Sequence, residues 1–324
     1  MFVYIKDKKT FDTKSLSVVL DYELNPSIYD TVSTVVIPKP DILPNEGDII
    51  FLEDGFIGVI ASYNVEYEKV TLDINQISML FSRNIFYTQQ TFEYAEDYLA
   101  SLIQTNFINQ TDSFYALPYL TVSAETHTTS SMKPDLENNL FSVKSYASKL
   151  RRLLGIFLNW SLTKDTLTVT IAQKNDTAKN IDFSNPDYIL TEQTFSSKTV
   201  SKITSFAEDT SAYQDWYLLS DGTITNTATQ DNRVDGEWVS LVVSESANVE
   251  DTVKSEFYKN EYSHKIKFTT YTSNNFELYD RLLISLNGSI FSSYVSGLVL
   301  KKNSNIVEVE CGELQTQYPF LNLD

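Results

Sequence analysis

The chain has 324 residues, of which 42% are hydrophobic and 21% charged, and this is typical of a globular protein of about two domains with a buried core. Lys and Arg total 25 against 43 Asp and Glu, a formal charge of −18, which argues against binding to nucleic acid or to an anionic membrane surface. The single cysteine, Cys311, excludes an internal disulfide and a cysteine-based zinc finger, and the two histidines, His127 and His264, leave little for a multi-histidine metal centre.

The start of the chain contains no apolar core of the length that a signal peptide needs. The densest apolar stretch, Leu153–Trp160, is far shorter than the roughly 20 residues that cross a bilayer. We therefore expect no membrane segment, and a protein that is made in the cytoplasm and is free to become part of a particle.

Three Asx-Gly pairs lie between runs of β-forming residues: Asp54-Gly55, Asp221-Gly222 and Asn287-Gly288. Such a pair favours a type I′ hairpin turn, because both central residues of that turn need positive φ. The chain also has 20 Tyr and 19 Phe, residue types that favour strands. The sequence therefore predicts a mainly β fold with antiparallel sheets.

Two segments have helical spacing instead. Apolar residues recur every three or four positions from Thr91 to Phe107 and from Phe141 to Trp160. The polar stretch Thr121–Asn139 between them predicts extended chain and loop, and Leu162–Ile171 predicts a hairpin. Together these segments predict an α+β module inserted into β-rich chain.

The two β-rich regions share a spacing. Val36, in a predicted strand, precedes Asp48 by 12 residues, and Phe268 precedes Asp280 by 12 residues. In both regions an Asx-Gly hairpin and a further strand pair follow. We interpret this as a duplicated β domain with other modules inserted between the copies; the alternative is that any antiparallel sheet produces similar spacings.

Catalytic motifs are missing from the sequence, which has no Gly-rich phosphate loop, nucleophile elbow or zincin motif. His127 lies among hydroxyl residues and is interpreted as a solvated loop residue, His264 as a packed or surface residue, and Cys311 as a buried structural thiol. The basic segment Lys144–Arg152 is interpreted as a solvated helix face rather than a site for an acidic partner. We expect no catalytic residue, no cofactor-binding residue and no metal site.

Several segments follow one another in the order found in a known protein family. They are Gly47-Asp48 with the hairpin Asp54–Ile60, Ile77–Arg83, Trp216–Gly222, Ser263–Phe268 and Glu308–Gly312. On these segments, which extend over nearly the whole chain, it resembles the baseplate hub or tail-associated (Tal) proteins of tailed bacteriophages. The resemblance implies a homotrimer with two related, tube-like β-barrel or β-sandwich domains per chain, so that six such domains continue a sixfold tail tube.

The resemblance also implies domain boundaries. Residues 1–88 are expected to form the first tube-like β domain, completed by strands near 180–200, and residues 89–178 the inserted α+β domain. Residues 198–206 and 262–324 are expected to form the second tube-like β domain, and residues 207–261 a smaller inserted β domain. Longer relatives append a hydrolase or a fibre, whereas this chain ends at Asp324, so we expect the hub part without the enzyme.

The implied function is that of a non-enzymatic virion protein at the tail tip or baseplate, which adapts the sixfold tube to a threefold tip and opens or closes the channel for DNA. Expected partners are the distal tail protein ring, the tape-measure protein and tail-fibre or receptor-binding components, with no stable nucleic-acid binding. Two alternatives remain. One is a host-carbohydrate-binding tail module, which the 13% aromatic content suits, and the other is a polysaccharide hydrolase with an unrecognised carboxylate pair.

Overall fold

The structure is a computed structural model of the whole chain. It describes all residues except 30, 87–91, 128–139, 164, 174–176, 196–199, 208–211, 220–222, 228–231, 234–235, 244–248, 259–263, 287–288 and 313–324. The chain forms two compact units. Unit 1 consists of Met1–Pro26 and Asp30–Asn175, and unit 2 of Ser27–Tyr29 and Asp176–Asp324.

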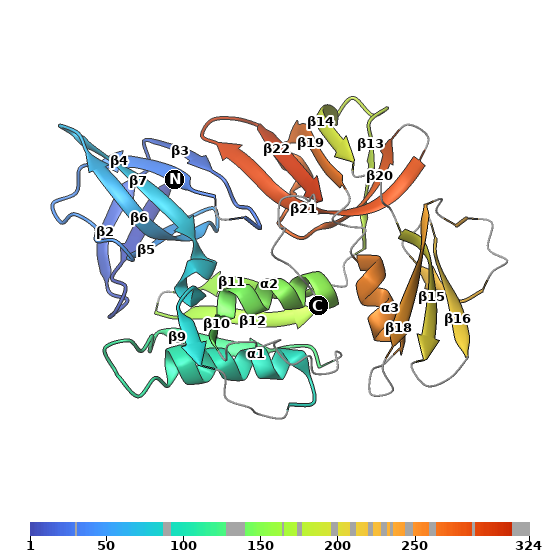
Figure 1. The fold of residues 1–324 in the computed structure, drawn as a ribbon. Helices are drawn as coiled ribbons and strands as arrows, with labels where there is room; N and C mark the ends of the chain where they lie inside the picture. Colours follow the sequence, from blue (N-terminus) through green and yellow to red (C-terminus); the bar gives the residue numbers. More distant parts are fainter. Residues whose placement is uncertain are drawn as a thin grey trace. The chain divides into compact units, whose positions relative to one another are not determined.

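The first part of unit 1 is an antiparallel β-sheet (Figure 1). Its strands are β1 (Phe2–Lys6), β2 (Thr13–Val18), β3 (Asp21–Leu24), β4 (Ser33–Pro38), β5 (Ile49–Leu52), β6 (Ile57–Val65) and β7 (Lys69–Gln76). They pair in the order β3-β4-β7-β6-β5-β1-β2. Val35 and Ile37 on β4 and Leu72 and Ile74 on β7 are buried and alternate with more exposed residues, as expected for strands with one face on a core.

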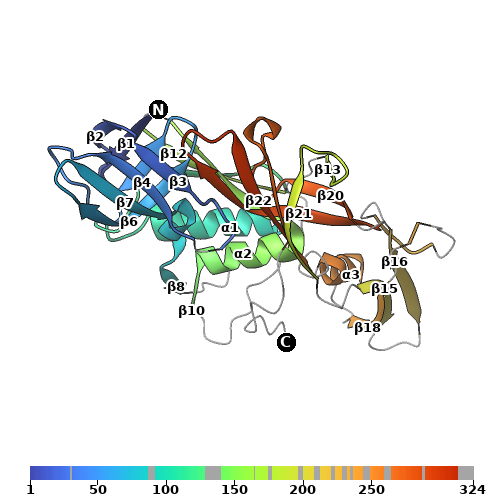
Figure 2. The same ribbon diagram turned by 90° about the horizontal axis from the view of Figure 1, so that it is seen from above.

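The second part of unit 1 is an α+β layer. Its elements are β8 (Asn84–Phe86), α1 (Ala95–Ile103), β9 (Leu120–Ala124), β10 (Leu140–Ser142), α2 (Val143–Leu154), β11 (Ile156–Leu162) and β12 (Leu167–Gln173). The sheet order is β11-β12-β9, with β9 parallel to β12, and β8 pairs with β10. Figure 2 shows α1 and α2 side by side.

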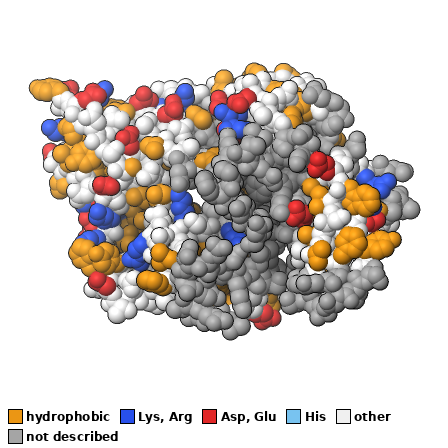
Figure 3. Space-filling view, in the orientation of Figure 1, with side chains coloured by type: hydrophobic (Ala, Val, Ile, Leu, Met, Phe, Trp, Pro, Cys, Tyr) orange, Lys and Arg blue, Asp and Glu red, His pale blue; other side chains and the backbone are white. Residues whose placement is uncertain are grey.

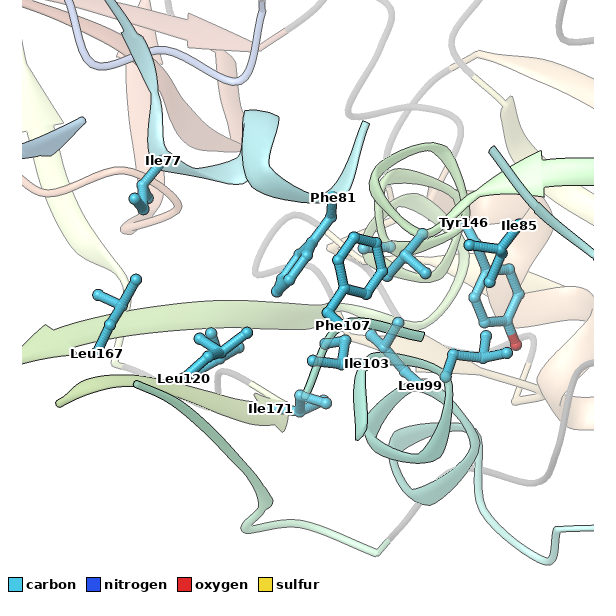
Figure 4. Packing of buried hydrophobic residues seen from close by; sticks show 14 of the residues in the cluster. Ile77, Phe81, Ile85, Leu99, Ile103, Phe107, Leu120, Tyr146, Leu167 and Ile171 are labelled. Atoms are coloured by element: carbon cyan, nitrogen blue, oxygen red, sulfur yellow. The ribbon is translucent and has the colours of Figure 1, made fainter. Parts of the chain in front are cut away.

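A single hydrophobic core joins the two parts of unit 1 (Figure 4). Phe81, in a 3₁₀ turn after β7, is fully buried. Its ring centroid lies 4.9 Å from that of Phe107, which follows α1, and 5.3 Å from that of Trp160 on β11. The aromatic rings therefore fix the α+β layer to the end of the β-sheet through buried apolar contact.

The first helix lies within the predicted segment Thr91–Phe107, although Thr91 itself is outside the described residues. The second predicted helix, Phe141–Trp160, is wrong at its end. The helix stops at Leu154 because Gly155 has a φ of 65° and donates its N–H to the carbonyl oxygen of Arg151, a left-handed cap that glycine adopts without steric cost. The residues from Ile156 to Trp160 belong to β11.

Unit 2 contains a second sheet. Its strands are β13 (Lys179–Asp182), β14 (Ile189–Phe195), β19 (His264–Tyr271), β20 (Arg281–Leu286), β21 (Ser289–Lys301) and β22 (Ile306–Gly312). They pair in the order β14-β19-β22-β21-β20-β13, and only β13 and β20 are parallel among these described strands. Phe268 lies at the centre of its core, against the rings of Phe183, Tyr188 and Phe276.

Unit 2 also contains a smaller sheet with the order β17-β16-β15-β18. Its strands are β15 (Val200–Ala207), β16 (Tyr213–Leu218), β17 (Ile224–Thr225) and β18 (Glu237–Val243), and α3 (Val249–Tyr258) follows them. Val253 and Phe257 of α3 pack with Ile203 of β15 in a small separate core. One face of this sheet is thus covered by α3.

Two of the predicted strand assignments differ from the structure. The strands near 180–200 pair with β20 and β19 of unit 2 and not with residues 1–88. Residues 200–207 pair with β16 and β18 in the smaller sheet and not with the strands of 262–324. In both cases the partner strands are distant along the chain. The alternation of apolar and polar residues within a strand does not identify the strand with which it pairs.

The mainly β fold with several sheets is as predicted. The Asp54-Gly55 turn joins β5 to β6, and the N–H of Gly55 donates to the carbonyl oxygen of Leu52 at 2.9 Å. The pairs Asp221-Gly222 and Asn287-Gly288 lie outside the described residues, as do residues 128–139 of the predicted loop and Ser263. No closed barrel is found in the part of the chain that the structure describes: in unit 1 the order runs from β3 to β2 without pairing between these two strands.

Candidate functional site

In unit 1 the chain enters β5 through a turn built on Asp48, whose side chain is buried. The carboxylate accepts hydrogen bonds from the backbone N–H groups of Asn45 at 2.8 Å and of Lys8 at 3.2 Å. The N–H of Asp48 donates to the carbonyl oxygen of Asn45, its own carbonyl oxygen accepts from the N–H of Ile60, and the N–H of Gly47 donates to the carbonyl oxygen of Ile60. Gly47 has a φ of +89°, which favours glycine.

The same hydrogen bonds recur before β20 in unit 2, on the buried Asp280. Its carboxylate accepts from the N–H of Glu277 at 2.9 Å, and its N–H donates to the carbonyl oxygen of Glu277. Its carbonyl oxygen accepts from the N–H of Val295, and the N–H of Tyr279 donates to the carbonyl oxygen of Val295. Tyr279 has a φ of +71°, an unusual value for an aromatic residue, at the position that Gly47 occupies in unit 1.

The strands around these two turns have the same arrangement. β4, β5, β6 and β7 pair as β19, β20, β21 and β22 do. The long strand that follows the hairpin has a register shift just after the bonded residue in each case, between Ile60 and Ser62 on β6 and between Val295 and Gly297 on β21. The same β-bulge therefore lies at the equivalent position of both sheets, and a β-bulge changes the direction of its strand.

The register shows that the predicted equivalence of Val36 and Phe268 is displaced by one residue. Phe268 pairs with Val309 on β22, and the matching pair in unit 1 is Val35 with Leu72. Val35 and Phe268 are both fully buried, whereas Val36 is half-buried. The loop from the inward-facing strand residue to the aspartate is therefore one residue longer in unit 1.

A lysine pairs with each buried aspartate, and the spacing pattern had not identified either one. Lys14 Nζ on β2 lies 2.9 Å from Asp48 Oδ2 and 2.8 Å from Asp7 Oδ2. Lys179 Nζ on β13 lies 2.7 Å from Asp280 Oδ2. The two lysines come from strands outside the repeated spacing, so no local motif marks them.

The charges around Lys14 stabilise one another. Desolvation would lower the pKa of Lys14, but its hydrogen bonds to Asp7 and Asp48 outweigh this and the pKa is raised. The hydrogen bond from Lys14, with those from the backbone of Thr10 and Lys9, holds the pKa of Asp7 well below its usual range. The ion pair in unit 1 is therefore a structural element that fixes the start of the sheet.

The outward side of β1 and β2 carries an apolar patch. Phe2 pairs with Val18 and Tyr4 with Leu16, and Tyr4 lies 6.0 Å from Phe51 between ring centroids. Leu16 is 55% exposed, and Phe2 and Val18 are also exposed. We call these five residues the β1–β2 outer face. Such a contiguous exposed patch is typical of a surface that another protein covers.

His264 and Cys311 are both buried in unit 2, as the sequence had indicated for the cysteine. His264 Nε2 lies 2.7 Å from Ser293 Oγ, and the side chain lies beside Gly312. Burial lowers the pKa of His264 from 6.5 to about 4 and raises that of Cys311. Both groups are therefore neutral at pH 7 and act as packing residues.

His264 is expected to destabilise the protein in acid. The unfolded chain binds this proton below about pH 6.5 and the folded chain only near pH 4, so the free energy of unfolding falls between these values by roughly 3 kcal/mol. Above pH 6.5 His264 is neutral in both states, so it no longer lowers the free energy of unfolding. Urea denaturation at pH 7 and pH 4.5 should show a smaller loss for His264→Gln than for the unchanged protein, and an equal loss in both would contradict this assignment.

The other residues considered from the sequence do not converge on one site. His127 is half-exposed, and its Nδ1 lies 3.1 Å from Asp97 Oδ2, in agreement with a loop histidine at the surface. In the basic segment Lys144–Arg152, Lys144 Nζ lies 3.0 Å from Met79 Sδ, so this side chain packs against the 3₁₀ turn. Among the described residues, no three His, Cys, Asp or Glu side chains are grouped so as to hold a metal ion, and no described helix has the length and apolar character to span a membrane.

Three solved structures with the same fold are tail proteins. A prophage tail protein from Listeria monocytogenes is 7% identical with a TM-score of 0.61, over 96% of this chain and 94% of that one. A 43 kDa tail protein of prophage MuSo2 from Shewanella oneidensis is 10% identical with a TM-score of 0.53, over 97% and 98%. A tail protein from Neisseria meningitidis is 15% identical with a TM-score of 0.50, over 96% of each chain.

No protein-family model and no curated protein sequence matches the chain. The structural matches nevertheless extend over nearly all of it. The chain therefore has the fold of phage tail proteins, and the resemblance that the sequence indicated is confirmed at the level of the fold.

Proposed function

We propose that this protein is a non-enzymatic structural component of a phage tail, or of a phage-tail-like particle, and forms the hub at the distal end of the tail. The tail-protein fold supports this role. The observation that carries it is the repeated sheet, in which Asp48 and Asp280 make the same turn with the same backbone hydrogen bonds.

In the proposed assembly three chains form a closed ring about a threefold axis. Each chain supplies the β1–β7 sheet and the sheet of β13, β14 and β19–β22, so the ring has six related places and matches a sixfold tube. Closed cyclic symmetry is the usual way in which identical chains complete such a ring. The threefold tip and the sixfold tube then meet within one protein.

The proposed hub docks on the distal tail protein ring and contacts the tape-measure protein on one side and tail-fibre or receptor-binding components on the other. It opens or closes the channel through which DNA leaves. The charge of −18 per chain suits this role, because an acidic or neutral surface repels the DNA phosphates instead of holding them.

The β1–β2 outer face is the proposed contact with the neighbouring copy in the ring. Leu16 is more than half exposed and lies on the same side as Phe2 and Val18. Covering such apolar side chains releases about 25 cal/mol for each Å² removed from water. A charge at the centre of this face is therefore expected to oppose assembly.

The oligomeric mass tests this proposal. Light scattering of the purified protein should give three times 36.9 kDa, and Leu16→Glu should shift the mass to that of the single chain, because the carboxylate would be buried without a partner. Ile42→Glu is the matched control, since Ile42 is exposed in the loop between β4 and β5 and is not one of the five residues of this face. A stable monomer of the unchanged protein at high concentration, with no assembly on a tail-tube or distal ring protein, would contradict the proposal.

A further inference from the structure

The smaller sheet of unit 2 has a second face that α3 does not cover. Side chains on this face alternate with Ile203, which packs against α3. Lys202 lies opposite Tyr217 on β16 and Trp238 on β18, and the next row holds Thr204 opposite Asp215. We call this surface the open face. Its main residues are Lys202, Thr204, Tyr213, Asp215, Tyr217 and Trp238.

The open face is solvent-accessible at two of its aromatic side chains, whereas Tyr217 and Thr204 are buried. Trp238 is 65% exposed and Tyr213 is 67% exposed. Figure 3 shows hydrophobic side chains beside basic and acidic ones over β15, β16 and β18. Large exposed aromatic groups beside fixed polar groups are typical of recognition surfaces.

Hydrogen bonds hold these groups in place. Trp238 Nε1 donates to Thr204 Oγ1 at 2.7 Å, and Thr204 Oγ1 donates to Asp215 Oδ1 at 2.5 Å. Lys202 Nζ lies 2.8 Å from Asp215 Oδ2 and 3.9 Å from the centre of the Trp238 ring. The indole is thus fixed through its N–H edge and by a cation on one side of the ring, so little side-chain entropy is lost when a ligand stacks on the exposed part.

The charged groups of the open face are few and largely paired. Desolvation would raise the pKa of Asp215, but hydrogen bonds from Lys202 and Thr204 outweigh it and the pKa is lowered. The carboxylate and the ammonium group therefore form an ion pair whose charges cancel. The guanidinium group of Arg233, 4.9 Å from the centre of the Tyr217 ring, adds one further cation. Nucleic acid requires an excess of cations, and the centres of protein–protein interfaces are depleted of Lys and Asp, whereas both lie at the centre of this face.

We propose that the open face binds a neutral oligosaccharide. A pyranose ring presents an apolar C–H side that stacks on the Trp238 indole, with Tyr213 at the far end of the face for a further unit. Its hydroxyl groups meet the ammonium group of Lys202, which has three donors and gives one to Asp215, and the carboxylate of Asp215, which has remaining acceptor capacity. This site is separate from the hub role and does not depend on the oligomeric state.

Calorimetric titration of the full chain with two neutral probes, cellotetraose and tetra-N-acetylchitotetraose, tests the site. We expect at least one to bind with a Kd below about 1 mM, and Trp238→Ala to weaken that binding by about tenfold or more. Trp238→Phe keeps an aromatic ring and should retain most of the affinity. Tyr271→Ala is the control, because Tyr271 is an exposed aromatic residue of unit 2 on a different sheet.

Circular dichroism of Trp238→Ala shows whether the variant is folded, and Trp238→Phe provides the second comparison if it is not. Two outcomes would overturn the proposal. One is the absence of heat from either sugar at about 10 mM, and the other is equal affinity of Trp238→Ala and the unchanged protein. A Trp238→Ala protein that keeps its sugar affinity but no longer joins a particle would identify the open face as a protein interface instead.

Discussion

Replacing Lys14 by methionine is expected to lower the free energy of unfolding by about 3–5 kcal/mol, because it leaves the buried carboxylate of Asp48 without its cation. Asp48 has no exposed surface, and Lys14 Nζ lies within 3.0 Å of both carboxylate oxygens. The backbone donors on Asp48 remain, but they do not neutralise its charge. Urea denaturation at pH 7 measures the loss.

Two further variants test whether the loss of stability comes from the buried, uncompensated charge. Lys179→Met, at the ion pair of Asp280, should cost only about 1 kcal/mol, because Lys179 is 39% exposed and solvent screens the pair. The double variant Lys14→Met with Asp48→Asn should recover part of the loss, since it removes the uncompensated charge. Equal losses for Lys14→Met and Lys179→Met would show that burial does not distinguish the two turns.

Replacing Phe81 by alanine is expected to cost about 3–5 kcal/mol through loss of buried contact and formation of a cavity. The ring is fully buried and contacts Phe107 and Trp160 across the junction between the β-sheet and the α+β layer of unit 1. Denaturation followed by fluorescence measures the change, because Trp160 adjoins the cavity.

Phe86 provides the control for this prediction. It is 77% exposed and belongs to β8, a few residues along the chain from Phe81. Phe86→Ala should change the free energy of unfolding by no more than about 0.5 kcal/mol. A loss below about 1 kcal/mol for Phe81→Ala would mean that the two parts of unit 1 do not depend on this contact.

The sequence was most informative where structure is local. The sequence placed a hairpin turn at Asp54-Gly55, although only Gly55 has positive φ, so the turn is not of the predicted type I′. It also indicated that Asp48 and Asp280 occupy equivalent turns, which the same backbone hydrogen bonds close although the loop before Asp48 is one residue longer. The sequence did not show that Val35, and not Val36, is equivalent to Phe268. In a short apolar run the spacing does not distinguish an inward-facing strand residue from its neighbour.

The pairing of strands that are distant along the chain could not be predicted from the sequence. Nothing in residues 189–195 indicates that they pair with β19, or in residues 200–207 that they lie parallel to β18. The ion pairs of Lys14 and Lys179 depend on the same kind of pairing, because each lysine reaches its aspartate from a strand that is not in the repeat. The open face was missed for this reason too, since Trp238 and Lys202 meet only through the pairing of β15 with β18.

The proposed hub is tested most directly by electron cryomicroscopy of the protein assembled on the end of its tail tube. The proposed architecture predicts three copies about one axis, with the β1–β7 sheet and the sheet that contains β19–β22 alternating in a ring of six places against the tube. A single copy at the end of the tube, or a ring in which only one of the two sheets contacts it, would contradict the proposal.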